Sequence, residues 1–183
     1  MIKKLKSRAG LTLTEMLVTM LILTMFSTAC LIGITTAFRA RQDNIKANFA
    51  DVLSSTVTQL ITDELRMSEF ETTPTDGPEI TYVSHASNYG KAKMYLNADG
   101  YLYMDVGSAD AGKSQPMLSS AMYMDTTQSD PRFKLKLADL YFSVDATNGN
   151  ITVTFQVIDD NGAVLADKTG DNGFTVKPLN GIS

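Results

Sequence analysis

The sequence predicts an α+β protein in which a long N-terminal helix packs on a C-terminal antiparallel β-sheet. Two observations lead to this fold class. The 23 residues from Met16 to Phe38 include neither a charged residue nor a proline, and the first proline of the chain is Pro74. Beyond residue 90, apolar and polar residues alternate in short segments that are separated by Asn-Gly and Asp-Gly pairs. Strands that follow one long helix in this way favour an antiparallel sheet laid against that helix.

The helix is expected to continue beyond the apolar run as an amphipathic segment. Between residues 45 and 65, apolar side chains recur every three or four positions, which is the period of one helix face. The helix is predicted to end between residues 67 and 72, before Pro74 and the turn Asp76-Gly77-Pro78. The apolar residues of this face are Ile45, Phe49, Leu53, Val57, Leu60, Ile61 and Leu65.

The strands are expected to pair across turn sequences such as Asn97-Ala98-Asp99-Gly100 and Thr147-Asn148-Gly149-Asn150. Asn and Asp before Gly are typical of hairpin turns, because these residues tolerate positive φ angles. The expected strands cover residues 93–96, 101–106, 121–125, 140–145, 151–157, 163–168 and 174–177, and residues 107–116 are expected to form a loop.

The charge of the chain is unevenly distributed. The chain has 183 residues and a net charge of −4, but its first ten residues hold four of the 16 basic residues and no acid. The remaining residues therefore carry 12 basic and 20 acidic side chains. An acidic body does not provide the basic face that nucleic-acid binding requires. The single cysteine, Cys30, rules out an intramolecular disulfide.

The apolar run is long enough to cross a membrane. As a helix, 23 residues span roughly 34 Å, which exceeds the hydrocarbon core of a bilayer. The basic residues before the run predict a cytoplasmic N-terminus and an extracytoplasmic body. Glu15 lies at the start of this segment, and a carboxylate near the membrane is expected to have a partner.

Three simpler interpretations fit the N-terminus less well. An ordinary secretory signal has an apolar core of about 7–15 residues, which is shorter than this run. A lipoprotein signal would use Cys30 after Ser27-Thr28-Ala29, but the residues from Leu31 to Ile34 are apolar where a polar tether is expected. A signal anchor that holds a binding ectodomain at the cell surface explains the length of the run but not Glu15. This third interpretation stays open as the alternative.

The N-terminus as a whole resembles the class III signal of type IV prepilins and type II secretion pseudopilins. The matching features are the basic leader, Gly10, the apolar Leu11, and Glu15 five positions after the glycine, followed by the apolar run. The family most often has phenylalanine where this chain has Leu11. Many members have a proline in the middle of the segment, where this chain has Gly33.

The resemblance implies how the chain is processed and assembled. It implies cleavage between Gly10 and Leu11 by prepilin peptidase, followed by N-methylation of Leu11. It also implies that the other partners are further pilin or pseudopilin subunits and the assembly platform of the cytoplasmic membrane. The chain would cross this membrane once before assembly and then enter an extracytoplasmic filament or stay at the cell surface. Residues 58–70 resemble the corresponding stretch of J-type minor pseudopilins, which favours a minor subunit.

Glu15 acquires a role in this scheme. Cleavage gives Leu11 a positive α-amine, and an unpaired charge in a dry filament core is costly. A Glu15 carboxylate on the adjacent subunit can pair with that amine and set the axial offset between neighbours. Buried pairs of this kind specify register better than they add stability. The expected segments are then a cleaved leader at 1–10, a transmembrane and filament-core helix at 11–38, an amphipathic continuation at 39–72 and a β-rich head at 73–183.

No catalytic, cofactor or metal site is predicted. The only histidine, His85, lies in a polar stretch, and the sequence contains no hydrolase, zinc or phosphate-loop motif. Asp and Asn residues gather near the C-terminus, where they could hold calcium, but their spacing suits hairpin turns better. They are Asp159, Asp160, Asn161, Asp167, Asp171 and Asn172.

Overall fold

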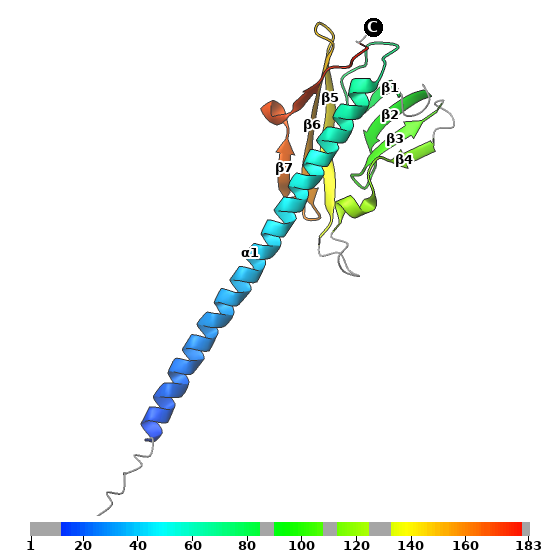
Figure 1. The fold of residues 1–183 in the computed structure, drawn as a ribbon. Helices are drawn as coiled ribbons and strands as arrows, with labels where there is room; N and C mark the ends of the chain where they lie inside the picture. Colours follow the sequence, from blue (N-terminus) through cyan, green and yellow to red (C-terminus); the bar gives the residue numbers. More distant parts are fainter. Residues whose placement is uncertain (1–11, 85–89, 108–112, 125–132, 181–183) are drawn as a thin grey trace, which may run out of the picture. The chain divides into compact units, whose positions relative to one another are not determined.

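The structure is a computed structural model that describes residues 12–84, 90–107, 113–124 and 133–180. These residues belong to two compact units, the first ending at Asn44 and the second beginning at Ile45. One helix, α1 (Leu13–Met67), runs through both units, and Figure 1 shows it as a single continuous element. All residues of α1 before Ile45 are exposed.

The helix α1 has 55 residues and ends within the predicted range. The last carbonyl groups of a helix need partners from outside it. Ser68 supplies some of these partners, because its Oγ donates to the carbonyl oxygens of Glu64 at 3.0 Å and Leu65 at 2.9 Å. The backbone N–H of Leu179 donates to the carbonyl of Arg66 at 2.9 Å. Leu179, far along the chain, therefore helps to satisfy the free carbonyl groups at the end of α1.

The described residues of the second unit form two four-stranded antiparallel sheets in place of the single sheet that the sequence predicted. The first sheet is a meander in the order β1-β2-β3-β4, and in the second sheet β6 pairs with β5 on one side and with both β7 and β8 on the other. The strands are β1 (Ile80–Ser84), β2 (Gly90–Leu96), β3 (Leu102–Val106), β4 (Lys113–Pro116), β5 (Leu135–Asp145), β6 (Asn150–Asp159), β7 (Val164–Lys168) and β8 (Phe174–Val176). The α+β class and the antiparallel pairing are confirmed.

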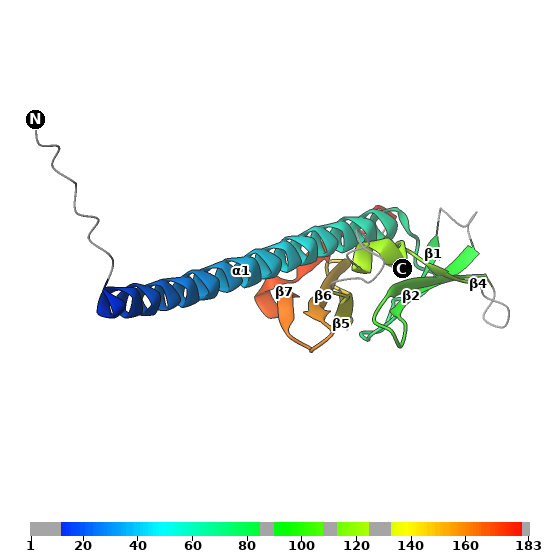
Figure 2. The ribbon, with the colours of Figure 1, turned by 90° about the horizontal axis from the view of Figure 1, so that it is seen from below.

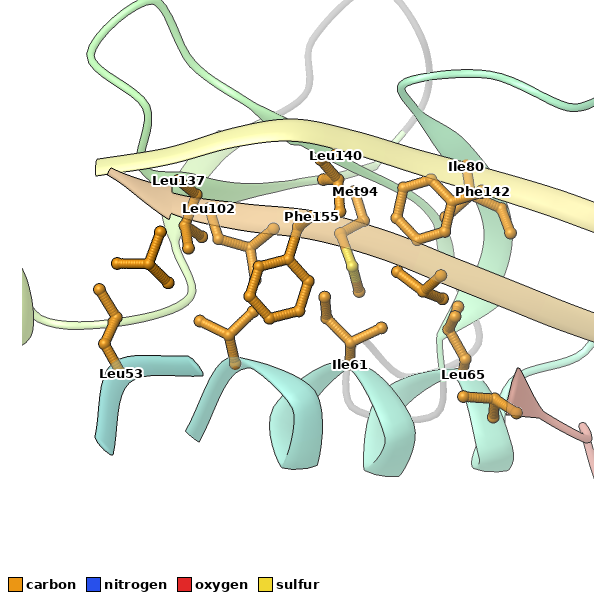
Figure 3. Packing of buried hydrophobic residues seen from close by; sticks show 14 of the residues in the cluster. Leu53, Ile61, Leu65, Ile80, Met94, Leu102, Leu137, Leu140, Phe142 and Phe155 are labelled. Carbon is orange, nitrogen blue, oxygen red and sulfur yellow. The ribbon is translucent and has the colours of Figure 1, made fainter. Parts of the chain in front are cut away.

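Both sheets contribute to one hydrophobic core, which one face of α1 covers. Figure 2 shows both sheets on the same side of the part of α1 that follows Ile45. Figure 3 shows Ile61 of α1 below Phe155 of the second sheet and Met94 of the first, and all three are fully buried. Apolar residues recur every three or four positions on the helix and every two positions on the strands. These two periods place the apolar side chains on the inward face of each element.

Gly100 connects the two sheets. Its carbonyl accepts a hydrogen bond from the backbone N–H of Leu137 at 2.8 Å, which ties the β2–β3 turn to β5. Gly100 has a φ of +76°, and a Cβ at this position would lie 2.8 Å from the carbonyl oxygen of Leu137. Only glycine combines this backbone conformation with so close an approach.

A bulge in β5 explains why the sequence pattern detected only the second half of this strand. Leu135 and Leu137 point inward at odd positions, whereas Leu140 and Phe142 point inward at even positions. The register shifts between Ala138 and Tyr141, and Asp139 within the shift has a φ of 52°. The extra residue reverses the alternation, so that a simple period of two fails across it.

The strand predicted at residues 121–125 is wrong. Residues Ser120–Tyr123 form a short 3₁₀ helix, η1, and the Oγ of Ser119 accepts a hydrogen bond from the N–H of Ala121 at 3.3 Å. Tyr123 is fully buried, and its hydroxyl oxygen accepts a hydrogen bond from the N–H of Leu102 at 3.1 Å. This tertiary contact outweighs the local alternation of apolar and polar residues.

The loop predicted at 107–116 is wrong at its C-terminal end, where β4 pairs with β3. All four residues of β4 are exposed and polar or proline, so they show no apolar period. Lysine and proline are common on edge strands, because they discourage pairing with another chain. The strand β1 was not predicted, although its inward side chains Ile80 and Tyr82 are buried.

Candidate functional site

The first turn of α1 is organised by two side chains, Thr12 and Glu15. The Thr12 carbonyl accepts the first helical hydrogen bond from the N–H of Met16 at 3.2 Å, so Thr12 is the N-cap. Its Oγ1 accepts a hydrogen bond from the N–H of Glu15 at 3.3 Å. In return, Oε2 of Glu15 accepts hydrogen bonds from the Thr12 N–H at 2.9 Å and the Thr12 Oγ1 at 3.1 Å. This reciprocal arrangement is a capping box.

The capping box holds the Glu15 carboxylate against the backbone N–H of Thr12, the first described residue of the chain. Glu15 is exposed, and an acid in the first turn is favoured by the helix dipole. Gly10 and Leu11, the predicted processing residues, lie outside the described residues. Thr12 was missed in the sequence, although the pattern Thr12-Leu13-Thr14-Glu15 before an apolar run is itself a capping-box signature.

The segment from Met16 to Phe38 satisfies the hydroxyl groups of its threonines within the helix. Each threonine hydroxyl donates to a backbone carbonyl three or four residues earlier, at 2.8–3.0 Å. Bonds of this type remove the cost of placing a hydroxyl in hydrocarbon. The threonines are Thr19, Thr24, Thr28, Thr35 and Thr36. Within the described residues, α1 is the one helix that is long and apolar enough to cross a membrane.

Charged residues return directly after this segment. Arg39, Arg41 and Asp43 are exposed, and none of them forms an ion pair with another described residue. Lys46, in the second unit, differs from them, because its Nζ lies 2.9 Å from Oδ2 of Asp159 at the end of β6. This ion pair connects the helix to the β6–β7 turn.

Two of the candidate calcium residues, Asp159 and Asp167, are occupied by contacts within the chain. Asp159 accepts hydrogen bonds from the backbone N–H groups of Asn161 and Ala163, both at 2.9 Å, in addition to the Lys46 ammonium. The Lys46 hydrogen bond is the main reason why the pKa of Asp159 is lowered. The Asp167 pKa is likewise lowered, chiefly by the Thr169 hydroxyl at 2.6 Å.

Neither a metal centre nor a catalytic constellation is evident in the part of the chain that the structure describes. No group of three His, Cys, Asp or Glu side chains there is placed to hold a metal ion. His85 lies outside the described residues. A shallow pocket of about 240 Å³ lies beside β1, and its lining combines threonines with Glu71, Glu79 and Lys91. Lys91 is paired with Glu71 at 2.7 Å and Glu79 with Lys93 at 3.2 Å, so each of the charged side chains that line the pocket has an ion-pair partner.

The comparisons with known proteins agree with the N-terminal geometry. A family model described as the prokaryotic N-terminal methylation motif matches residues 5–31, which include the second part of the leader, the capping box and the apolar segment as far as Leu31. No curated protein and no solved structure matches the chain. This motif is the class III signal, and here it opens a long helix that is followed by antiparallel sheets. The chain therefore carries the prokaryotic N-terminal methylation motif at residues 5–31, at the start of its long helix.

Proposed function

We propose that the chain is a minor subunit of a type IV pilus, a competence pseudopilus or a type II secretion pseudopilus. The observation that carries this proposal is the class III signal at the start of a helix whose first part is wholly exposed. A helix that is apolar on all sides needs lipid or other helices around it. Prepilin peptidase and further pilin subunits are the partners that such a signal implies. Residues 58–70, with their resemblance to J-type pseudopilins, favour the minor role.

In this proposal Gly10 and Leu11 form the cleavage site, and cleavage gives Leu11 a positive α-amine. Thr12 directly follows Leu11, and its N–H is already bonded to Glu15. The capping box therefore presents a carboxylate near the new terminus before assembly begins. In a filament, the Glu15 carboxylate would exchange the Thr12 contacts for the α-amine of an adjacent subunit. Charge-assisted hydrogen bonds are stronger than neutral ones, which favours this exchange in a dry core.

Mutation of Glu15 tests the assembly role. Glu15→Ala is expected to leave membrane insertion and cleavage intact but to remove the chain from sheared filaments. Thr12→Ala is the matched control, because it removes the N-cap hydroxyl and keeps the carboxylate. This control is expected to assemble. Quantitative immunoblotting of sheared and membrane fractions measures both results, and normal incorporation of Glu15→Ala would contradict the proposal.

The mature N-terminus separates this function from the alternative. Mass spectrometry is expected to find a chain that begins with N-methylated Leu11. A chain that retains Met1 and stays in the membrane would instead favour a signal-anchored ectodomain with a binding role. The stoichiometry of the chain in sheared filaments then separates a minor subunit from a major one.

A further inference from the structure

The outward face of the first sheet combines two tyrosines with charged and hydroxyl side chains. The strands β2, β3 and β4 are neighbours in this sheet (Figure 1). Met94 and Leu102 point into the core and are fully buried. The residues next to them point to the other face, because successive side chains of a strand alternate. This surface, named the tyrosine face, is formed by Lys93, Tyr95, Tyr103, Asp105, Ser114 and Pro116.

The side chain of Tyr95 lies across the tyrosine face. Tyr95 belongs to β2, but its hydroxyl lies 3.1 Å from Oδ1 of Asp105 in β3 and 2.8 Å from Oγ of Ser114 in β4. The ring of Tyr103 is its neighbour, with 6.4 Å between the ring centroids. Both tyrosines are half-buried, so that part of each ring is accessible. Because the Tyr95 hydroxyl is anchored, a ligand that contacts the ring loses little of its binding energy to ordering it.

Lys93 connects the Tyr95 ring with the pocket beside β1. Its Nζ lies 5.1 Å from the centroid of the Tyr95 ring and 3.2 Å from Oε2 of Glu79. Glu79 lines the pocket, and so does Thr81, which is opposite Lys93 in the register of β1 and β2. The pocket and the tyrosine face are therefore one continuous surface, which lies wholly within the second unit.

The pocket offers hydroxyl groups together with charges that are already paired. Each lysine at the pocket is bound by a glutamate, at 2.7 Å and 3.2 Å. An anionic ligand would have to displace a glutamate, and a cationic ligand would have to displace a lysine. A neutral ligand with many hydroxyl groups can bind both members of an ion pair without separating them, and hydrogen bonds to charged groups are stronger than neutral ones. The threonines that line the pocket are Thr72, Thr73, Thr75 and Thr81.

The size of the pocket and the aromatic ring near it match a sugar polymer. The pocket has a volume of about 240 Å³, below the roughly 300–1,000 Å³ of pockets that hold drug-sized ligands, so it accommodates a single sugar ring. The face of an aromatic ring carries negative partial charge and attracts the C–H groups on one side of a sugar ring. We propose that this surface binds a neutral polysaccharide, with one sugar ring in the pocket and the following rings along the tyrosine face.

Other classes of ligand match this surface less well. Nucleic acids and acidic polysaccharides are bound by basic groups that are free to contact them, whereas the lysines here are paired with glutamates. The centre of a protein interface is usually apolar. The tyrosine face contains no leucine, isoleucine, valine or methionine, and the large exposed apolar side chains of the described residues lie on other elements.

This binding would not require assembly into a filament. The β-rich head would face the outside of the cell in a filament and equally in a membrane-anchored chain. Binding can therefore be measured on the isolated chain, and its failure would leave the proposed filament function intact.

Neutral hexasaccharides test the proposal on the full chain. The chain is kept in a zwitterionic detergent, because a detergent with a sugar headgroup would compete for the site. The probes are the β-1,4-linked hexamers of glucose, mannose and N-acetylglucosamine, whose extended chains match a flat sheet face. Saturation-transfer NMR detects weak binding, and titration calorimetry measures the dissociation constant. At least one probe is expected to bind, with little dependence on salt. Binding of none of the three would overturn the proposal.

Substitutions of Tyr95 test the aromatic contact. Tyr95→Ala is expected to weaken the binding of that probe about tenfold, because it removes the ring. Tyr95→Phe keeps the ring and is expected to weaken binding by less than about threefold. Tyr141→Ala is the matched control, since Tyr141 is exposed on β5 of the other sheet. Circular dichroism verifies that each variant is folded. Equal affinity of Tyr95→Ala and the wild-type chain would overturn the proposal.

A substitution of Thr81 tests the pocket. Thr81→Val keeps the β-branched shape, removes one hydroxyl from the lining and is expected to weaken binding about threefold. Thr175→Val, at an exposed position of β8, is the matched control and is expected to bind like the wild-type chain. Unchanged affinity of Thr81→Val would exclude the pocket from the site.

The remaining outcomes identify other ligands. If only a hexamer of galacturonic acid binds, and salt abolishes its binding, the lysines act as a charge site and the proposal is overturned. If no saccharide binds and Tyr95→Ala loses another pilin subunit from sheared filaments, the tyrosine face contacts a protein instead. Saccharide binding by a wild-type chain that is absent from filaments would reject the proposed function and retain this site.

Discussion

The two parts of α1 share one backbone geometry and differ in what their side chains contact. Before Ile45 every residue is exposed, including Leu23 at 63% and Phe26 at 67%. After Ile45 one face is fully buried, and Leu53 and Ile61 have no exposed surface at all. Both parts are α-helical throughout, so the difference lies in the side chains.

This difference shows that the same secondary structure can serve two separate purposes. The second part obtains its stability from a core that its own chain supplies. The first part finds no such core in the described chain and must bury its apolar surface against lipid or other subunits. Changes in the first part should therefore affect insertion and assembly, and changes in the second part should affect folding.

The largest expected effect tests this division directly. Ile61→Ala removes a fully buried side chain and is expected to lower the free energy of unfolding by about 2–5 kcal/mol. Leu23→Ala is the matched control in the exposed part and should change the same free energy by less than about 0.5 kcal/mol. Denaturant unfolding of the full chain in detergent, followed by circular dichroism of the sheets, measures both. Similar losses of unfolding free energy in the two variants would contradict the proposed difference between the two parts of α1.

A smaller effect tests whether the two sheets of the second unit unfold together. Gly100→Ala places a Cβ 2.8 Å from the Leu137 carbonyl at a positive φ and should cost about 3 kcal/mol. Gly162→Ala is the control, since Gly162 has a similar φ of +79° but open space around the Cβ position. It should cost only about 1 kcal/mol. Two separate unfolding transitions in Gly100→Ala would mean that Gly100 alone joins the sheets.

The smallest effect on stability is expected at the ion pair between Lys46 and Asp159. Lys46 lies close to the point where one face of α1 becomes buried. Asp159→Asn should lower the free energy of unfolding by about 2 kcal/mol at neutral pH, because it removes a charge-assisted hydrogen bond from a buried group. The folded pKa of Asp159 is lowered by Lys46, so this stabilisation is present above the unfolded value of about 3.9. It is lost as the pH falls through the folded pKa.

Unfolding curves at a series of pH values check this linkage. The wild-type chain and Asp159→Asn should differ at neutral pH and converge in strong acid. Asp51→Asn is the control, because Asp51 is exposed on α1. It should show the same stability as the wild-type chain at every pH. A constant difference between the wild-type chain and Asp159→Asn at all pH values would show that the Asp159 charge does not provide the stabilisation.

Strong local patterns were read correctly from the sequence, and weak ones were not. The α1 pattern and the alternation from Ile151 to Val157 continue without interruption, so the helix and β6 were predicted close to their observed bounds. The four residues of β4 are exposed and polar and give no such signal. Residues 121–125 gave a misleading signal, because the burial of Tyr123 and its hydrogen bond with the Leu102 N–H outweigh the local pattern.

The candidate site was predictable because its signal is contiguous. Gly10, Leu11 and Glu15 lie within six residues of one another, and the basic leader directly precedes them. The family model begins within this leader, at residue 5, and covers all three residues. The cleavage point and the assembly role of Glu15 remain predictions. The contacts of Thr12 needed the structure, because a capping box is defined by the distance from each of its two side chains to the backbone N–H of the other residue.

The sequence alone determined the long helix, its apolar first part, the class III signal and the antiparallel strands. These features depend on periodicity, composition and spacing, all of which are local. Only the tertiary structure decided that there are two sheets, that β5 changes its inward face at Asp139, and that Lys46 pairs with a residue 113 positions away. Such features depend on which distant segments share a core, and no local pattern encodes that choice.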